Sequence, residues 1–474
     1  MLEMNENFGL YTDFYELAMA EGYFYCNKKD QQVSFNYFFR TNPFGGGFTV
    51  FAGLADFLEM LSQFTYSASD IQYLKEQGFK PEFLEYLKDF RFSGNILSVK
   101  EGEIVFPNEP VLRVDGNIIE CQLIESLLLN MLNFESLIAT KAFRIKLVAG
   151  KQVFAEFGLR RAQGLAAIHA SRAACIGGAS STSNVLAGKL FDIPVSGTMA
   201  HSWIQSFDTE LEAFRSYSNV HPENTTLLVD TYDTLKSGVP NAIVVAKEME
   251  ENGYQLKAIR LDSGDLAYLS KKARKMLDDA GLKTVKIIAS NQLNEHVIKT
   301  LLTDQFAAID AFGIGTEMVT GKPDAALDGV YKLTEIEGMP KMKFSENIEK
   351  NTLPSKKQLY RFLDSNGKFY RDAIALESEI PSEIDVIYHP VYPELNTKVK
   401  GLSFEKLLTT VVEKGEILLE KQSTMDIYQF LKERAELLPE EHKRFISPHI
   451  YKTGITQQLM ETRNNLSKQI KKMF

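Results

Sequence analysis

The chain has 474 residues and a mass of 53.6 kDa, and its 53 Lys and Arg against 62 Asp and Glu give a formal charge of −9. Its 44% hydrophobic and 24% charged residues are typical of a folded globular protein and exclude a disordered one. The acidic balance argues against a general affinity for nucleic acid or an anionic membrane. One local arginine cluster is still enough to bind an anionic small substrate.

The cysteine pattern and the first residues point to the cytoplasm. The three cysteines are widely spaced and form no CxxC motif, so we expect neither a disulfide framework nor a thiolate zinc site. The N-terminus carries Glu3 and Glu6 and lacks a cationic segment followed by an apolar run, so no signal peptide is expected. No apolar run approaches the ~20 residues of a transmembrane helix. We therefore expect a soluble cytoplasmic enzyme.

The range 1–145 mixes helix and strand patterns. Asp13, with Glu16 three residues further on, is typical of a helix N-terminus. The aromatic segment 35–51, interrupted by three glycines, predicts two strands around a loop. Alternating apolar and polar residues over 95–114 predict antiparallel β structure, and 118–149 predicts long helices. We interpret this range as an N-terminal α+β domain.

In the range 146–335, short apolar runs recur and are bounded by polar or glycine-rich loops. The runs lie at 153–157, 193–196, 226–229, 256–261, 285–289 and 308–312, and helical patterns follow at 242–251, 266–280 and 295–303. Such alternation predicts right-handed βαβ units and a parallel sheet. Six strands in series favour an irregular, incomplete α/β barrel, with a doubly wound open sheet as the alternative. Either fold places its functional loops at the carboxyl ends of the strands.

The range 336–474 has a different pattern. Short β-like pieces at 331–336, 358–363 and 407–412 precede a charged helical tail, whose basic run 468–472 is typical of a solvated helix face. We expect this C-terminal segment to pack back on the N-terminal domain, so that the α+β domain is built from both ends of the chain.

The loops after the predicted strands hold the residues that carry chemistry. Gly313–Thr316 offers backbone N–H groups to a phosphate, while Asp230 and Asp262 are suited to hold Mg²⁺ beside phosphates or to orient hydroxyls. His201 can exchange a proton near neutral pH or act as a nucleophile. Three arginines can bind phosphate or carboxylate through planar forks: Arg160, Arg161 and Arg260. Together these loops suit a phosphorylated, magnesium-bound sugar substrate.

Each of these motifs also has a purely structural interpretation. A lone loop histidine is often solvated, the run 262–265 is often a helix N-cap, and the run 313–316 is often a tight turn. Their recurrence at successive strand ends favours the functional interpretation. The sequence lacks a GxxxxGK[ST] loop, a GxGxxG fingerprint and a His/Cys metal array.

Seven segments, in order along the chain, resemble the nicotinate phosphoribosyltransferase family. They are TDFYELAM (12–19), FFRTNPFGG (38–46), EFGLRRAQG (156–164), GTMAHSW (197–203), LVDTYDTL (228–235), RLDSGDL (260–266) and FGIGTEMVT (312–320).

The resemblance implies a reaction and a fold. Nicotinate would attack the anomeric carbon of phosphoribosyl pyrophosphate in the presence of Mg²⁺, giving nicotinate mononucleotide and pyrophosphate in NAD salvage. ATP hydrolysis would be coupled through a phosphorylated histidine, at the position of His201. The family has an irregular α/β barrel beside an α+β domain and works as a homodimer with shared active sites.

The resemblance also implies roles for single residues. Phe157 would stack on one face of the pyridine ring, and Tyr15 of the neighbouring subunit would cover the other. Thr198 and Arg260 would meet the nicotinate carboxylate. The phosphates would lie against Arg40, Arg160 and the turn that contains Gly313, Gly315 and Thr316, with Asp230 and Asp262 at the ribose and base.

The choice between acid and amide is predicted from Ser183. The related nicotinamide enzymes carry an aspartate at the position aligned with this serine, and a carboxylate there would repel nicotinate. Ser183 therefore favours the acid. Two alternatives stay open at this point: a nicotinamide phosphoribosyltransferase, and a catalytically silent, ligand-binding homologue.

Overall fold

The computed structural model describes residues 7–345 and 351–472, and by its contacts the chain divides into two compact units. Unit 1 contains Met1–Leu137, Ala326–Gln422 and Gln429–Phe474, and unit 2 contains Ile138–Ala325 and Ser423–Tyr428. Glu3 and Glu6, on which the signal-peptide expectation rests, lie outside the described residues. The domain ranges 1–145, 146–335 and 336–474 stay predictions.

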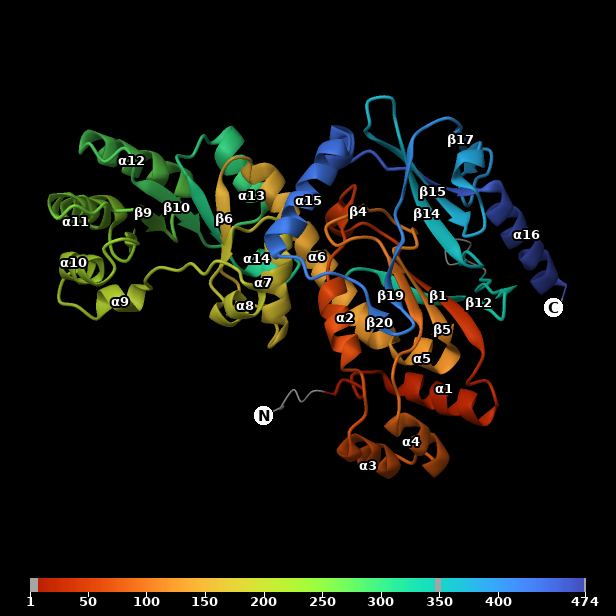
Figure 1. Cartoon of the computed structure of the whole chain (residues 1–474). Coiled ribbons are helices and arrows are strands. Elements are labelled where there is room, and N and C mark those ends of the chain that lie inside the picture. The colour runs from red at the N-terminus through yellow and green to blue at the C-terminus, as the bar shows by residue number, and fades with distance from the viewer. Residues whose placement is uncertain (1–6, 346–350, 473–474) are drawn as a thin grey trace. The chain divides into compact units, whose positions relative to one another are not determined.

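Unit 2 is built of short strands that alternate with helices (Figure 1). Its strands are β6 (Val153–Glu156), β7 (Ser181–Thr182), β8 (Thr226–Leu228), β9 (Ala258–Leu261), β10 (Lys286–Ser290) and β11 (Ala311–Ile314). Its helices are α7 (Ala166–Ile176), α8 (Val185–Phe191), α9 (His201–Gln205), α10 (Glu210–Val220), α11 (Val239–Glu251), α12 (Leu266–Asp279), α13 (Glu295–Lys299) and α14 (Thr316–Val319), with π-helical turns η2 (Thr234–Gly238) and η3 (Thr300–Asp304).

The six strands of unit 2 form one parallel sheet in the order β7-β6-β11-β10-β9-β8. The apolar strand residues pack against α10, α11 and α12 in a core that includes Leu227, Ile259, Ile287, Val245 and Leu277. Burial on both faces is why these strands read as continuous apolar runs. The α/β class with a parallel sheet is confirmed. The described pairing leaves β7 and β8 at opposite ends of the sheet, which agrees with an incomplete barrel.

One predicted strand is wrong. The run 193–196 is no strand of the sheet and contributes an isolated bridge between Val195 and Thr182. The sheet takes β7 in its place, and two hydrogen bonds, from the Thr182 N–H to the Pro194 carbonyl (3.0 Å) and from the Ser196 N–H to the Thr182 carbonyl (2.9 Å), join the run to it. Because β7 has only two residues, it offers too little edge for a longer neighbour.

Unit 1 consists of helices and largely antiparallel sheets. Its helices are α1 (Phe14–Tyr25), α2 (Leu54–Ser62), α3 (Ala68–Glu76), α4 (Pro81–Lys88), α5 (Ile118–Leu123) and α16 (Gln457–Lys471), with 3₁₀ turns η1 (Pro43–Gly45), η5 (Pro381–Glu383) and η6 (Glu440–Lys443); α6 (Glu125–Ala149) and α15 (Thr424–Leu437) contribute residues to both units. Its strands are β1 (Gln32–Phe39), β2 (Thr49–Val50), β3 (Asn95–Ser98), β4 (Ile104–Val105), β5 (Leu112–Asn117), β12 (Gly329–Ile336), β13 (Met339–Pro340), β14 (Lys357–Leu363), β15 (Phe369–Leu376), β16 (Val386–Tyr388), β17 (Asn396–Lys398), β18 (Phe404–Lys406), β19 (Thr409–Glu413), β20 (Glu416–Ile417) and β21 (Thr453–Thr456).

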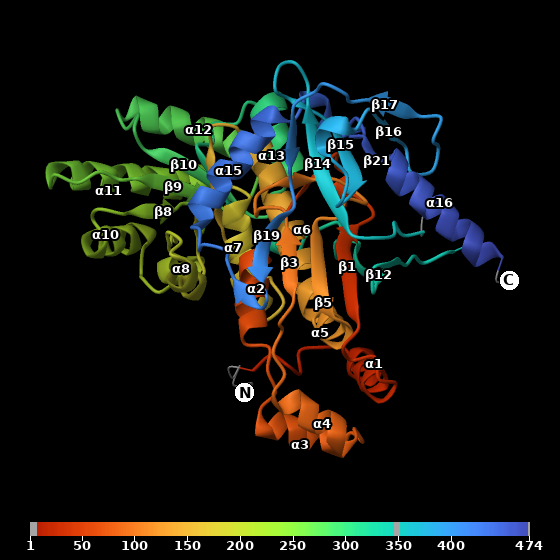
Figure 2. The ribbon, with the colours of Figure 1, turned by 45° about the vertical axis from the view of Figure 1, so that its right-hand side comes forward.

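Segments from both ends of the chain share the sheets of unit 1. The seven-stranded antiparallel sheet has the order β13-β12-β1-β5-β3-β19-β20, so β1 lies beside β12 and β3 beside β19, and Figure 2 shows β1, β5, β3 and β19 side by side. A six-stranded sheet, β17-β16-β21-β15-β14-β18, is formed by C-terminal residues. Buried ion pairs join the segments: Arg361 of β14, with no exposed surface, bonds to Asp372 of β15 (2.7 Å) and Glu103 (2.6 Å).

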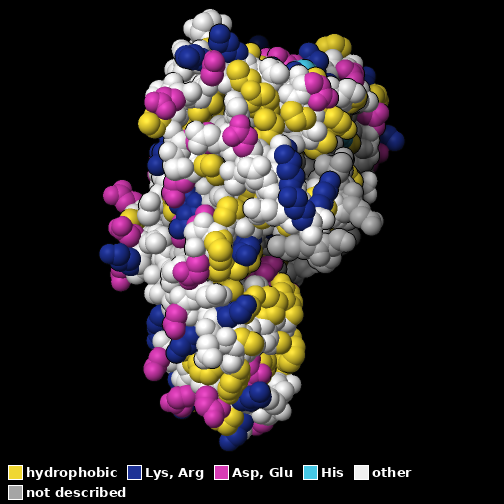
Figure 3. All heavy atoms as spheres, turned by 90° about the vertical axis from the view of Figure 1, so that its right-hand side faces the viewer, with side chains coloured by type: hydrophobic (Ala, Val, Ile, Leu, Met, Phe, Trp, Pro, Cys, Tyr) yellow, Lys and Arg dark blue, Asp and Glu magenta, His cyan; other side chains and the backbone are white. Residues whose placement is uncertain are grey.

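Charged side chains of both signs lie on the surface. Figure 3 shows basic and acidic side chains interspersed over one face, so the net negative charge forms no single-sign patch there. Among residues 7–345 and 351–472, no helix is both long and apolar enough to cross a membrane. Cys26 is exposed, whereas Cys121 and Cys175 are buried, and all three are free thiols.

Candidate active site

Arg260 is the centre of a polar cluster at the carboxyl ends of the unit 2 strands. Its guanidinium donates to Thr198 Oγ1 (3.1 Å), Ser290 Oγ (2.8 Å) and Asp262 Oδ1 (2.8 Å). These partners come from the loop before α9, from the end of β10 and from the residue after β9. The parallel strand order brings them together, because β9 and β10 are neighbours in register.

Asp230 and Asp262 lie side by side in the same cluster. The backbone N–H of Asp262 donates to Asp230 Oδ2 (2.9 Å), and the Ser263 hydroxyl donates to the same oxygen (2.6 Å). The other oxygen, Oδ1 of Asp230, is buried and has no hydrogen-bond partner. A buried carboxylate oxygen without a donor fits a hydroxyl or a hard cation such as Mg²⁺.

His201 begins α9 and is tied to the loop after β8. Its Nδ1 lies 3.0 Å from Thr231 Oγ1, and Thr231 directly follows Asp230. The histidine, the two aspartates and Arg260 therefore belong to one connected set of loops. Because Nδ1 is engaged by Thr231, Nε2 is the ring nitrogen left for chemistry.

Phe157 follows β6 and forms an aromatic wall of the cluster. The Arg260 guanidinium lies 5.6 Å from the centroid of the Phe157 ring. The backbone N–H of Phe157 donates to the Ile314 carbonyl (2.7 Å). Gly313 packs directly on the ring: a Cβ there would stand 2.5 Å from two ring carbons. A Cβ on Gly315 would stand 3.0 Å from the Phe157 carbonyl. The run 313–316 therefore needs glycine for close packing.

Ser183 is positioned next to Phe157 through a residue that the sequence did not single out. The Ser183 N–H donates to the carbonyl of Glu156 (2.8 Å), and the fully buried Glu156 carboxylate also accepts from the Thr182 hydroxyl (2.5 Å). Glu156 stands in the motif EFG, but a single glutamate at the end of an apolar run carries no signal that separates it from an exposed strand residue. Ser290 and Thr231 were also missed as site residues, although Ser290 follows the apolar Ala289 at the end of β10 and Thr231 follows Asp230 in the loop after β8.

The remaining expected site residues are not part of this cluster as described. Arg160 and Arg161 are exposed in the loop after β6, and their side chains make no hydrogen bond or ion pair with described residues. Tyr15 and Arg40 belong to unit 1: Tyr15 is exposed on α1, and Arg40 follows β1 with its Nη1 3.8 Å from Asp328. Burial and the carboxylates of Glu125 and Glu16 raise the pKa of Tyr15.

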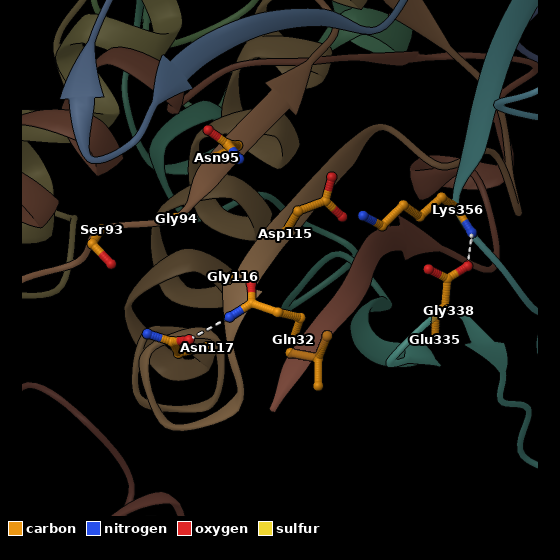
Figure 4. A pocket seen from close by; sticks show the side chains of 11 residues that line it. Gln32, Ser93, Gly94, Asn95, Asp115, Gly116, Asn117, Glu335, Gly338 and Lys356 are labelled. Atoms are coloured by element: carbon orange, nitrogen blue, oxygen red, sulfur yellow. Dashed lines mark hydrogen bonds between the residues drawn. The ribbon is translucent and has the colours of Figure 1, made fainter. Parts of the chain in front are cut away.

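A polar pocket of about 220 Å³ lies within unit 1 and contains none of the expected site residues (Figure 4). Its wall includes the ends of β1, β5 and β12. Asp115 and Lys356 point toward one another across it, as Figure 4 shows. This pocket is therefore lined by other residues than those at the strand ends of unit 2.

Comparisons with known proteins agree on one family. The model of the nicotinate phosphoribosyltransferase N-terminal domain matches residues 10–133, that of the nicotinate phosphoribosyltransferase family matches 153–373, and that of the C-terminal domain matches 356–463. A nicotinate phosphoribosyltransferase of Bacillus subtilis is 44% identical over 462 residues, with 96% of this chain and 94% of the relative covered. One of Dictyostelium discoideum is 38% identical, with 96% and 88% covered.

Solved structures point the same way. The human nicotinic acid phosphoribosyltransferase matches with a TM-score of 0.87 at 30% identity, covering 96% of this chain and 99% of that one. A nicotinate-nucleotide pyrophosphorylase of Pyrococcus furiosus matches with a TM-score of 0.71 at 25% identity, covering 92% and 97%.

Proposed function

Because the chain belongs to the nicotinate phosphoribosyltransferase family, we propose that it joins nicotinate to phosphoribosyl pyrophosphate, with ATP and Mg²⁺, in cytoplasmic NAD salvage. The products are nicotinate mononucleotide and pyrophosphate, with ADP and phosphate from the ATP. The observation that carries the proposal is the Arg260 cluster, in which a forked guanidinium, Thr198 and the Phe157 ring adjoin one another. That set supplies a carboxylate partner beside an aromatic stacking surface.

The cluster suits nicotinate in charge and shape. The Arg260 fork pairs with the substrate carboxylate through charge-assisted hydrogen bonds, and Thr198 adds a hydroxyl. Phe157 stacks on one face of the pyridine, worth about 0.5–1.5 kcal/mol beyond area burial. Tyr15 of a neighbouring subunit would cover the other face. The neutral Ser183 does not repel the nicotinate carboxylate, whereas a carboxylate at this position would.

The transfer step asks for positioning and charge neutralisation. The lone pair of the pyridine nitrogen forms the new bond to the anomeric carbon, and the bond to pyrophosphate breaks, with its electron pair leaving on the pyrophosphate oxygen. The phosphates would lie against Arg40, Arg160 and the turn with Gly313, Gly315 and Thr316. Asp230 and Asp262 would hold Mg²⁺ or the ribose hydroxyls; the ion would neutralise pyrophosphate charge.

His201 is the proposed acceptor of the ATP γ-phosphoryl group. Nε2 would attack the γ-phosphorus, ADP would leave, and water would later remove the phosphoryl group as phosphate. The support for this assignment is the Thr231 contact at Nδ1, which leaves Nε2 unengaged. A phosphoryl group there would place about two negative charges next to Asp230. Repulsion between the two groups would shift the loop after β8.

We propose a homodimer with shared active sites. Exposed apolar side chains support this: Phe14, Tyr15 and Met19 on α1, and Val185 and Leu186 on α8. Neighbouring exposed apolar side chains, such as Tyr15 and Met19 one helical turn apart, mark an interaction surface more often than a single exposed residue does.

The function is tested by incubating the purified protein with nicotinate, phosphoribosyl pyrophosphate, Mg²⁺ and ATP and following nicotinate mononucleotide. Formation of the nucleotide, stimulated by ATP, is expected. A parallel reaction with equimolar nicotinamide measures acid over amide preference. Product from nicotinamide alone would favour the amide enzyme, and no product from either base would favour a silent homologue.

A further inference from the structure

Glu156 is a buried carboxylate at the end of β6, and its partners come from the loop after β6, from α7 and from β7. One oxygen, Oε1, accepts the backbone N–H of Gly158. The other, Oε2, accepts the hydroxyls of Ser171 on α7 (2.8 Å) and Thr182 on β7 (2.5 Å). The side chain has no exposed surface. A carboxyl group buried in this way is tolerated only when hydrogen bonds satisfy it, and here three donors do.

The contacts of Glu156 flank two residues that the proposed function assigns to nicotinate. Gly158 directly follows Phe157, and Thr182 directly precedes Ser183. The Glu156 carbonyl also accepts from the Ser183 N–H (2.8 Å). One residue thus bonds to both sides of the site at which the pyridine ring would lie.

Besides the Glu156 carboxylate, a few backbone hydrogen bonds hold the two segments, among them those from Phe157 to Ile314 and between Thr182 and the run 194–196. β7 is two residues long and pairs with β6 only through Ala155↔Ser181 and Glu156↔Thr182. On the other side, Gly158 approaches so closely that a Cβ would stand 2.3 Å from Val319 Cγ1 and 2.9 Å from the Glu156 carboxylate. Removing the carboxylate would leave a buried Gly158 N–H unsatisfied and would remove the side-chain link between the loop after β6 and β7.

We infer that Glu156 is a positioning residue for the pyridine end of the site: it holds Phe157 and Ser183 in the relative arrangement that selects nicotinate. The inference rests on the proposed function. Glu156 itself stays behind the site wall and need not touch substrate. Its loss should affect the binding of nicotinate more than that of phosphoribosyl pyrophosphate, whose proposed contacts lie in other loops.

The test compares Glu156→Ala and Glu156→Gln with Ser270→Ala as a matched control. Ser270 of α12 is equally buried in unit 2 and accepts the Ala308 N–H (3.2 Å), but contacts no expected site residue. For Glu156→Ala we expect the KM for nicotinate to rise roughly 10- to 100-fold, the KM for phosphoribosyl pyrophosphate to change little, and the preference for acid over amide to fall. In Glu156→Gln the KM for nicotinate should stay close to the wild-type value, because the amide oxygen of the glutamine still accepts from the Gly158 N–H.

Two outcomes overturn the inference: an unchanged KM for nicotinate in Glu156→Ala, or equal effects in Glu156→Ala and Ser270→Ala. Should Glu156→Ala fail to fold, Thr182→Val replaces it, because that isosteric change removes one donor to the carboxylate. A several-fold rise in the KM for nicotinate is then expected. An unchanged KM would contradict the positioning role of Glu156.

Hydrogen exchange separates failure of this inference from failure of the proposed function. In Glu156→Ala the backbone amides of 157–160 and 182–184 should exchange faster than in wild type, whether or not the chain acts on nicotinate. Unchanged exchange there would overturn the positioning role even in an active enzyme. Faster exchange in a protein that makes no nucleotide would instead discard the proposed function and leave the structural link intact.

Discussion

The forked guanidinium of Arg260 joins side chains from two strand ends and from the loop before α9, and its geometry decides what a substitution should do. Arg260→Lys keeps the charge but replaces a planar fork by a single ammonium, which cannot reach Thr198, Ser290 and Asp262 together. Each charged hydrogen bond is worth about 1.5–3 kcal/mol, so we expect kcat/KM for nicotinate to fall roughly 10- to 100-fold. Steady-state kinetics with varied nicotinate measure this loss.

Arg274→Lys is the matched control for that experiment. Arg274 of α12 also forks, to Asp278 (2.9 Å) and to the carbonyls of Val285 (2.6 Å) and Leu282 (2.8 Å), but it contacts no expected site residue. Its replacement should lower stability without changing the KM for nicotinate. Equal kinetic effects of the two lysine variants would show that Arg260 is structural.

His201 gives a second prediction for a single residue. In His201→Ala the stimulation by ATP should disappear while slow, ATP-independent transfer persists, because the histidine takes the phosphoryl group but not the sugar. The measurement is nucleotide formation with and without ATP, together with acid-labile label from radioactive ATP. His221→Ala, which removes an exposed histidine of the same unit, should keep both. Retained stimulation in His201→Ala would refute the assignment.

Among the elements, α1 carries a pH-dependent contact. Glu16 accepts from Thr12 (2.5 Å) and from Ser126 of α6 (2.5 Å), and burial, reinforced by Glu125 and Asp13, raises its pKa from 4.5 to about 7. The folded state therefore binds a proton that the unfolded chain releases above pH 4.5. This contribution to stability is complete below pH 4.5 and is lost as the pH rises through 7.

Glu16→Gln should remove that dependence, because its amide stays neutral while filling the same space. Relative to wild type, the variant should gain stability as the pH rises from about 4.5 to about 7, by up to about 1.4 kcal/mol per pH unit, and the difference should stay constant above that range. Urea unfolding at several pH values measures the difference. Glu59→Gln removes the same charge from an exposed side chain of unit 1 and serves as the control. If the free energies of unfolding of Glu16→Gln and wild type changed with pH in parallel, the raised pKa of Glu16 would be contradicted.

The elements also show what a sequence can predict. Buried apolar runs identified β6, β8, β9, β10 and β11 to within about three residues, because strands covered on both faces must be apolar. β7 escaped because its two residues, Ser181 and Thr182, are polar and are held by hydrogen bonds to other side chains. The apolar run 193–196, by contrast, resembled a strand but supplies only a bridge.

For the candidate site, position after a strand was the useful signal. It identified Asp230 and Asp262, while Arg260 was found at the end of the predicted run 256–261 and lies within β9; the structure joins the three directly. It could not identify Glu156, whose role depends on two partners distant in sequence, Ser171 and Thr182. Nor could local patterns relate Tyr15 or Arg40 to the strand ends; those roles came from the family resemblance and stay predictions.

In a whole molecule with active sites shared between subunits, two inactive variants can together form an active site. Tyr15 lies in unit 1 and Arg260 in unit 2, so a dimer that exchanges Tyr15 would build each site from two chains. Tyr15→Ala and Arg260→Ala should each be nearly inactive. In a mixed dimer, however, one site takes both substitutions and the other takes neither. Because two-fold symmetry gives two equivalent sites, an equilibrated equimolar mixture should recover about a quarter of the wild-type activity.

The experiment mixes the two variants under conditions that allow subunit exchange and follows nicotinate mononucleotide formation, with sedimentation to establish the dimer. If each site were complete within one chain, every subunit would carry one damaged site, and the mixture would show only the average of the two variants measured alone. Activity above that average therefore distinguishes the two architectures. The same readout tests Tyr15 as a contact that crosses between subunits, because no recovery is possible unless the intact tyrosine and the intact arginine meet in one site.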